Sequence, residues 1–127
     1  MLAGVPVLAH HAFQAEFDAN RPVTLRGTVT KMEWINPHPW IHIEVKDPKT
    51  GQTQEWAIEA SAPNALLRRG FTKASLQPGT VIKVDGYQSK DGALRANGRD
   101  LTLPDGRTLF LGNAEAGAEG GPGAVKK

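Results

Sequence analysis

Hydrophobic and polar residues alternate along much of this chain, which is the pattern of β-strands with one buried face. Residues 23–34 alternate in this way, with Val23 and Leu25 on one face and threonine and arginine on the other. Gly27 lies in the middle of this segment and permits the bend that a barrel strand requires. The apolar phase shifts after Lys31, which predicts a β-bulge at that point.

Five further segments alternate in the same way and are separated by turn-forming residues. Residues 47–51, 90–92 and 104–106 each contain Asp and Gly, and they predict tight turns between consecutive strands. The predicted strands are residues 40–46, 54–60, 81–87, 94–103 and 108–111.

The period changes between the third and fourth strands of the chain. Ser61 is predicted to cap a short helix that continues to Arg69, with Pro63 in its first turn and Gly70 just past its end. One helix is too few for a parallel sheet, which needs a crossover after each strand. We therefore predict an all-β fold, a small OB-like Greek-key barrel of five to six strands with one short helix between strands three and four.

The length of 127 residues allows one domain. The barrel is predicted to span residues 10–111, with residues 12–22 as an irregular lead-in. Residues 1–9 are interpreted as the remnant of a signal peptide or a flexible N-terminus, and the Gly/Ala-rich residues 112–127 as a disordered tail. No apolar run reaches the ~20 residues of a membrane span. Without cysteine, the chain has neither disulfides nor thiolate metal sites.

Two pairs of histidines are the most prominent candidate chemistry. His10 and His11 directly follow the apolar residues 1–9, whose last three, Val-Leu-Ala, resemble the small-residue end of a signal peptide. Cleavage after Ala9 would make His10 the first residue of an exported protein. Its free amine and its imidazole would then be able to chelate a metal of the copper type.

The second pair lies in a proline-rich segment. Pro37 and Pro39 fix the backbone on either side of His38, on a stiff loop between the first two strands. In OB barrels that loop borders the ligand face. His42 follows on the second strand, about 13 Å from His38 at the ordinary spacing of strand residues. A binding surface around this loop is predicted from Asn36, Trp40 and Trp34.

Two interpretations of the histidines remain open. In one, the N-terminal pair is on the surface, His38 hydrogen-bonds to a loop carbonyl group, and His42 pairs with Glu44 or Glu59. In the other, the N-terminal segment lies against the loop, and all four imidazoles form a site for copper or zinc. The predicted metal ligands are then His10, His11, His38 and His42.

Six short motifs stand out once the strands are placed. They are His10–Phe13, Glu16–Asp18, Gly27–Val29, Glu33–His38, Ala62–Asn64 and Lys90–Gly92. Together they resemble a family of small exported bacterial proteins whose function is unknown. The resemblance covers about residues 10–112 and is most specific in the string Glu-Trp-Ile-Asn-Pro-His. It implies a signal peptide that ends just before the His-His pair, hence a periplasmic or secreted location, and it implies no activity.

Charge is distributed unevenly along the chain. The formal net charge is +2, but residues 10–60 carry five Lys and Arg against seven Asp and Glu, whereas residues 68–107 carry eight against four. Trp40 would lie among glutamates of the first three strands, which is a poor setting for phosphate groups. We therefore predict that nucleic acid is not a partner.

The motifs that are missing narrow the function further. No serine lies in a nucleophile-elbow pattern and no glycine-rich phosphate loop is present, so no enzyme activity is predicted. The sequence predicts an exported small binding protein whose ligand is a metal ion, with copper as the ion it would hold. The alternative is a structural or protein-interaction module without a metal, including self-assembly through an open barrel edge.

Overall fold

One long strand organises the fold in the computed structural model, which describes residues 16–112. β1 (Phe17–Glu33) pairs with β4 (Val81–Ser89) through its first part and with β2 (Trp40–Lys46) through its second part. The two pairings overlap at Gly27 and Thr28, and a Cβ atom at Gly27 would lie 2.5 Å from a backbone oxygen of β2. Only glycine allows so close an approach, so this position lets one strand serve both sides of the barrel.

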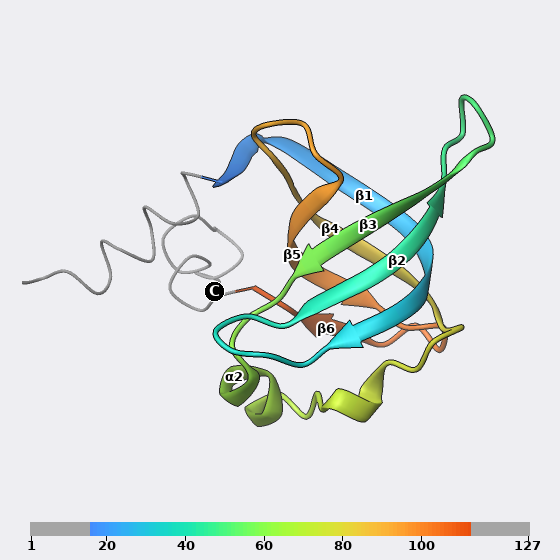
Figure 1. Ribbon diagram of the computed structural model, residues 1–127. Helices are drawn as coiled ribbons and strands as arrows, with labels where there is room; N and C mark the ends of the chain where they lie inside the picture. Colours follow the sequence, from blue (N-terminus) through green and yellow to red (C-terminus); the bar gives the residue numbers. More distant parts are fainter. Residues whose placement is uncertain (1–15, 113–127) are drawn as a thin grey trace, which may run out of the picture.

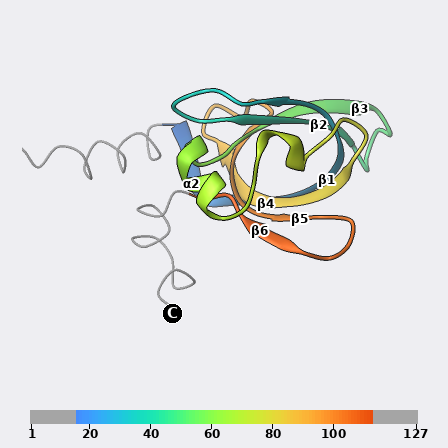
Figure 2. The ribbon, with the colours of Figure 1, turned by 90° about the horizontal axis from the view of Figure 1, so that it is seen from below.

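The remaining strands complete a closed ring (Figures 1 and 2). β3 (Thr53–Glu59) pairs with β2, β5 (Arg95–Thr102) with β4, and β6 (Thr108–Phe110) with β5, all antiparallel. The ring closes where β3 and β5 run parallel, a pairing that we call the seam. The helix α2 (Pro63–Arg68) and a 3₁₀ turn (Lys73–Ser75) lie between β3 and β4. The predicted all-β, OB-like barrel with one short helix in this position is confirmed.

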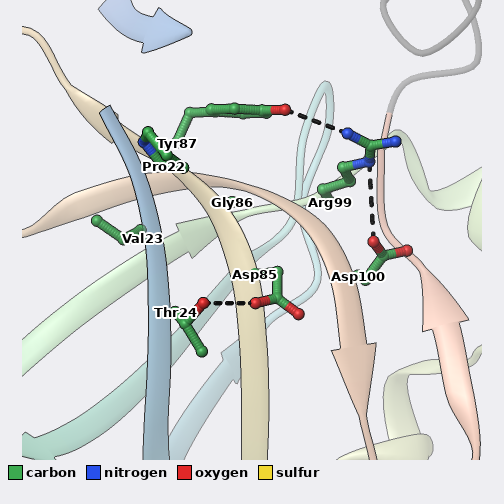
Figure 3. A pocket seen from close by; sticks show the side chains of 8 residues that line it. All are labelled: Pro22, Val23, Thr24, Asp85, Gly86, Tyr87, Arg99 and Asp100. Atoms are coloured by element: carbon green, nitrogen blue, oxygen red, sulfur yellow. Dashed lines mark hydrogen bonds and ion pairs between the residues drawn. The ribbon is translucent and has the colours of Figure 1, made fainter. Parts of the chain in front are cut away.

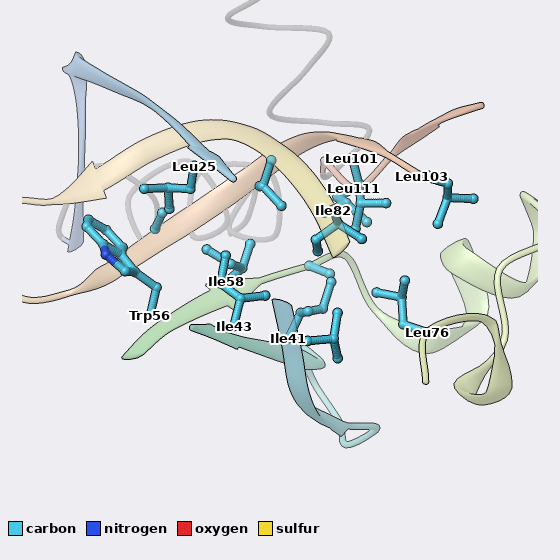
Figure 4. Close-up of a cluster of buried hydrophobic side chains, with 14 of the residues drawn as sticks. Leu25, Ile41, Ile43, Trp56, Ile58, Leu76, Ile82, Leu101, Leu103 and Leu111 are labelled. Carbon is cyan, nitrogen blue, oxygen red and sulfur yellow. The ribbon is translucent and has the colours of Figure 1, made fainter. Parts of the chain in front are cut away.

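Inward-facing strand residues fill the barrel (Figure 4). Buried and more exposed residues alternate along β2, β3 and β4, as the sequence pattern predicts. Trp56, which the alternation placed on the inner face, is only 6% exposed. Each large apolar side chain contributes roughly 1.5–3 kcal/mol by leaving water. Fully buried strand residues include Ile41, Ile43, Ile58, Val84 and Leu101.

The helix α2 and the residues after it cover one end of the barrel (Figures 1 and 2). Leu66 of α2, Phe71 and Leu76 are all buried. Trp34, in the loop after β1, stacks on Phe71 with the ring centroids 6.3 Å apart and the planes 5° from parallel. This aromatic pair fastens the loop between β1 and β2 to the helical cover.

The strand β1 begins earlier than predicted. The sequence predicts an irregular lead-in over residues 12–22, whereas β1 already begins at Phe17, which is 2% exposed and pairs with β4. The register shifts between Phe17 and Pro22, and this irregularity hides the strand from the alternation. The predicted bulge is present, but it lies between Val29 and Lys31 rather than after Lys31.

The helix is shorter than predicted, and Ser61 has a different role. α2 starts at Pro63, with Ala62 as its N-cap and no side-chain cap. Ser61 is 3% exposed, and its hydroxyl hydrogen-bonds to the backbone oxygens of Leu111 and Gly112. A long-range contact therefore uses the serine that the local sequence assigns to helix capping.

The described residues do not include either end of the chain. The predictions for the signal remnant, for His10 and His11, and for the tail after residue 112 lie outside them. Gly112, which the sequence placed at the start of that tail, is buried. Within residues 16–112, no helix is long and apolar enough to cross a membrane.

Candidate functional site

The loop before β2 and the loop before β5 each accept a backbone hydrogen bond from the last part of β3 or the residue after it, one on each side. On the β2 side, the N–H of Ala60 donates to the carbonyl oxygen of Pro39 (3.0 Å). On the β5 side, the N–H of Ala57 donates to that of Leu94 (3.1 Å). In OB barrels these two loops border the ligand face. We call the region around the end of β3 the β3–β5 site, and it consists of Glu16, His38, Glu59, Arg95 and Asn97.

His38 is held at this site by the backbone. Its Nδ1 lies 3.0 Å from the carbonyl oxygen of Ala60. A carbonyl oxygen only accepts, so Nδ1 carries the proton and donates it, and in the neutral ring Nε2 keeps its lone pair. The hydrogen bond to a backbone carbonyl group that one interpretation of the sequence expects is therefore present. It also fixes the tautomer that leaves Nε2 available to a ligand.

Glu59 is the last residue of β3 and is half-buried. Its Oε1 accepts a hydrogen bond from the side-chain amide of Asn97 (3.0 Å), which lies directly opposite in the seam. Burial raises the pKa of Glu59, whereas the Asn97 amide and the positive charges of His38 and Arg95 act to lower it. A negative charge on Glu16 adds to the rise. The carboxylate is thus partly removed from water and is electrostatically coupled to the other members of the site.

Arg95 links the loop between β4 and β5 to the point where the described chain begins. Its guanidinium lies 3.9 Å from the carboxylate of Glu16 and 3.5 Å from that of Asp91. The N–H of Lys90 donates to the carbonyl oxygen of Glu16 (2.8 Å). The hydrogen bond from the hydroxyl of Ser89 is the main reason why the pKa of Asp91 lies below its ordinary value, and a backbone N–H and Arg95 lower it further. This loop and Glu16 are therefore fixed beside the seam.

His42 is separate from this site. Its Nε2 donates to Oε1 of Glu33 at 2.6 Å, and its Nδ1 lies 4.0 Å from Oε2 of Glu55. The hydrogen bond from His42 is the main reason why the pKa of Glu33 is lowered. The expected pairing with Glu44 or Glu59 is wrong, because His42 lies opposite β1 and Glu33 is its diagonal neighbour across the two strands. The structure does not bring His38 and His42 together.

The predicted binding-surface residues lie in different surroundings. Asn36 is exposed in the loop before β2. Trp40 is half-buried and lies opposite Glu33 in β1 and Glu59 in β3. Trp34 stacks on Phe71 at the helical cover. Trp40 is therefore the tryptophan nearest in register to the β3–β5 site.

No three His, Asp or Glu side chains within residues 16–112 are grouped so that they could hold a metal ion. Of the four histidines, the described part of the chain places only His38 at the β3–β5 site. Sequence reasoning missed Glu59 and Asn97 as members of one site because only the seam joins them. The only sequence feature that pointed to Asn97 is that it is a polar residue at an outward-facing position of a predicted strand.

A shallow pocket of about 180 Å³ lies elsewhere, on the outer face of β1, β4 and β5 (Figure 3). Its polar groups are bonded to one another. The hydroxyl of Thr24 donates to Asp85 (2.7 Å), and Arg99 lies 3.2 Å from the hydroxyl of Tyr87 and 3.8 Å from the carboxylate of Asp100. This network leaves the pocket a weaker candidate than the β3–β5 site.

The comparisons with known proteins agree with this architecture. The model of DUF6152, a family of unknown function, matches residues 1–98. The chain belongs to this family. No curated protein sequence matches it. Among solved structures, the mitochondrial single-stranded DNA-binding protein Rim1 of S. cerevisiae is similar, with a TM-score of 0.51 and 13% identity over 65% of this chain and 92% of that chain. At this identity the likeness shows the fold alone.

This comparison corrects the prediction that excluded nucleic acid as a partner. That prediction rested on the net charge of +2 and on glutamates near Trp40, yet a solved structure with a similar fold is that of a single-stranded DNA-binding protein. The argument from charge considered one face of the barrel. On the face formed by β1 and β4, Arg26 lies directly opposite Lys83, a local concentration of positive charge that the net value hides.

Proposed function

We propose that this DUF6152 protein is an exported small binding protein that holds a divalent metal ion of the copper type at the β3–β5 site. The observation that carries the proposal is the hydrogen bond between Nδ1 of His38 and the carbonyl oxygen of Ala60 (3.0 Å). Histidines that bind metals commonly use one ring nitrogen in this way, which orients the ring and leaves the other nitrogen as the ligand.

The start of the described chain supports the same location. Glu16 lies at the site, against Arg95 and the backbone of Lys90. His11 and His10 precede Glu16 by five and six residues, and an extended chain spans at most about 3.6 Å per residue. The segment that carries both imidazoles therefore joins the described chain at this site. A nitrogen-rich set of ligands favours copper among the common divalent ions.

Export is part of the proposal, because cleavage after Ala9 would give His10 a free amine. N-terminal sequencing or the intact mass of protein isolated from the native cell envelope tests this step. A protein that retains Met1 there would lack the chelating amine at His10, which removes much of the support for a copper site.

A titration with Cu(II), followed by tryptophan fluorescence, tests the site itself. On protein that begins at His10, we expect His38→Ala and His10→Ala each to weaken binding at least tenfold, which is about 1.4 kcal/mol. His42→Ala is the matched control, since Glu33 already binds the Nε2 of that ring. If all three variants bind copper like the parent, the site does not exist, and the interaction-module interpretation replaces it.

Single-stranded nucleic acid is a second candidate ligand, favoured by the basic face of β1 and β4. Like charges directly opposite each other destabilise a strand pair, and Arg26 and Lys83 form such a pair. Within residues 16–112, neither has an ion-pair partner. A polyanion would relieve this repulsion, and the similar OB barrel Rim1 is a single-stranded DNA-binding protein.

Fluorescence anisotropy with a labelled oligothymidylate, at low and at physiological salt, tests this candidate. Binding should weaken with salt and should be lost in a variant with both Arg26→Ala and Lys83→Ala. His38→Ala serves as the control, because the β3–β5 site contains neither of these residues. Binding that is insensitive to the double substitution would remove this candidate.

A further inference from the structure

Residues 60–80, which form α2 and the rest of the helical cover, carry positive charge only. They include Arg68, Arg69 and Lys73 but neither Asp nor Glu. Among residues 16–112, no carboxylate forms an ion pair with Arg68 or Lys73, and both side chains are exposed. Arg69 donates to the carbonyl oxygens of Phe110 (3.0 Å) and Gly112 (3.1 Å), which are neutral partners. The cover therefore keeps three positive charges without a neutralising carboxylate in the described part of the chain.

Two large hydrophobic side chains are exposed at the same end of the barrel. Leu67 of α2 is 48% exposed, and Ile35, in the loop between β1 and β2, is 45% exposed. The stack of Trp34 on Phe71 fastens this loop to the helical cover (Figures 1 and 2). Among the described residues, only Val81 is a further large hydrophobic side chain of similar exposure. Exposed apolar groups that gather with charged groups on one surface mark an interaction site.

We propose that this end of the barrel is a membrane-surface contact, in which Arg68 and Lys73 bind anionic lipid headgroups while Ile35 and Leu67 enter the apolar layer beneath them. Aliphatic side chains combined with Lys and Arg are what attaches peripheral proteins to anionic membranes. Long basic side chains reach the headgroups while neighbouring apolar groups lie deeper. The contact goes beyond the proposed function and uses no residue of the β3–β5 site.

The exposed groups of this surface suit lipid better than single-stranded nucleic acid. Bases of a single strand stack on exposed aromatic rings. Here the exposed large side chains are aliphatic, Phe71 is only 1% exposed, and Trp34 already stacks on it. Positive charge beside aliphatic groups therefore favours a partner that is anionic at its surface and apolar just below it, which describes a bilayer of anionic lipids.

Cosedimentation of the full chain with lipid vesicles tests the contact. The probes are vesicles of phosphatidylcholine alone and vesicles of equal parts of phosphatidylcholine and phosphatidylglycerol, at low and at physiological salt. We expect binding only to the anionic vesicles, and we expect salt to weaken it. The double variant Arg68→Ala with Lys73→Ala should bind about tenfold more weakly or worse. The double variant Ile35→Ser with Leu67→Ser should show a similar loss, because it removes the apolar groups that leave water.

The matched control removes two positive charges elsewhere. Lys46 and Lys49 lie at the hairpin between β2 and β3, which extends away from α2 in both views (Figures 1 and 2). Lys46→Ala with Lys49→Ala should bind the anionic vesicles like the parent. All six substituted side chains are exposed, and circular dichroism checks that each variant is folded. Should the Ile35 and Leu67 variant not fold, Leu67→Gln alone replaces it.

Several outcomes would overturn the contact. Equal binding to both kinds of vesicle removes the role of charge, and binding that either double variant leaves unchanged removes the role of this surface. An equal loss in the Lys46 and Lys49 control would show that net charge alone is responsible. If the parent ignores the vesicles but binds a labelled oligothymidylate through Arg68 and Lys73, the surface belongs to nucleic acid. None of these results changes the outcome of the Cu(II) titration, so the two proposals fail separately.

Discussion

The last described residues of the chain are expected to determine whether the barrel is stable. Leu111 is fully buried, and its N–H donates to the carbonyl oxygen of Arg99 (2.7 Å). Ser61 binds its backbone oxygen twice, through the N–H and through the hydroxyl, both at 2.9 Å. We compare a chain that ends at Gly112 with one that ends at Phe110.

The cost of the shorter chain is the sum of lost burial and lost hydrogen bonds. Removing the buried leucine side chain forfeits roughly 1.5–3 kcal/mol. The N–H and hydroxyl of Ser61, which is 3% exposed, lose their acceptors at about 1–3 kcal/mol each. The total is about 4 kcal/mol or more, against a typical stability of roughly 5–15 kcal/mol. For a domain of this size that is a fall of at least about 15 °C in Tm.

Thermal denaturation followed by circular dichroism measures this difference. The chain that ends at Gly112 should melt within a few degrees of the full chain, because it keeps every contact described above. The full-length variant Leu111→Ala provides a check without truncation, with an expected loss of about 2–5 kcal/mol. The reasoning is refuted if the chain ending at Phe110 melts within a few degrees of the chain ending at Gly112. A large fall at Gly112 would instead show that residues 113–127 add to stability.

Two carboxylates and one glycine allow three further tests. His42 lowers the pKa of Glu33, so the charged form of Glu33 stabilises the fold above the ordinary value of 4.5, and this stabilisation is lost as pH falls through the lowered value. Glu33→Gln should therefore flatten the acid side of a profile of Tm against pH, and an unchanged profile contradicts this. Burial raises the pKa of Glu59, so the charge of its carboxylate costs stability above the raised value and costs none below 4.5. Glu59→Gln should therefore melt higher than the parent at neutral pH and at the same temperature at acid pH. A lower Tm of the variant at neutral pH argues against a cost of burying this carboxylate. Gly98→Ala would place a carbon 2.8 Å from Cγ2 of Ile58, an overpacking that costs about 1–3 kcal/mol; a urea denaturation midpoint equal to that of the parent would show that the barrel adapts.

The strands and the fold were predictable because they depend on local alternation. The inward direction of Trp56, for example, follows from the alternation of buried and more exposed residues along β3. The start of β1 was missed because Phe17 is buried by contacts with β4 and not by a pattern around it. Ser61 was misassigned for the same reason, since its partners are at the other end of the domain.

The candidate site also has one part that the sequence predicts and another part that depends on long-range contacts. The loop position of His38 follows from its flanking prolines and from the order of the strands. The hydrogen bond from Asn97 to Glu59 depends on the parallel register of β3 and β5, which no local pattern specifies. The pairing of His42 with Glu33 depends on the register between β1 and β2, including the bulge. Sequence can therefore name the candidate ligands, but tertiary pairing decides which of them meet.

The seam has a consequence for the order in which the molecule assembles. It joins β3 to β5 through only three residue pairs, from Ala57 with Arg95 to Glu59 with Asn97. These strands are far apart in the chain, so their contact carries a larger loop-closure entropy than the neighbouring hairpins and is expected to form after them. The β3–β5 site consequently exists only in the closed barrel. A ligand bound there adds its own binding free energy to closure and stabilises the shortest strand pairing of the ring.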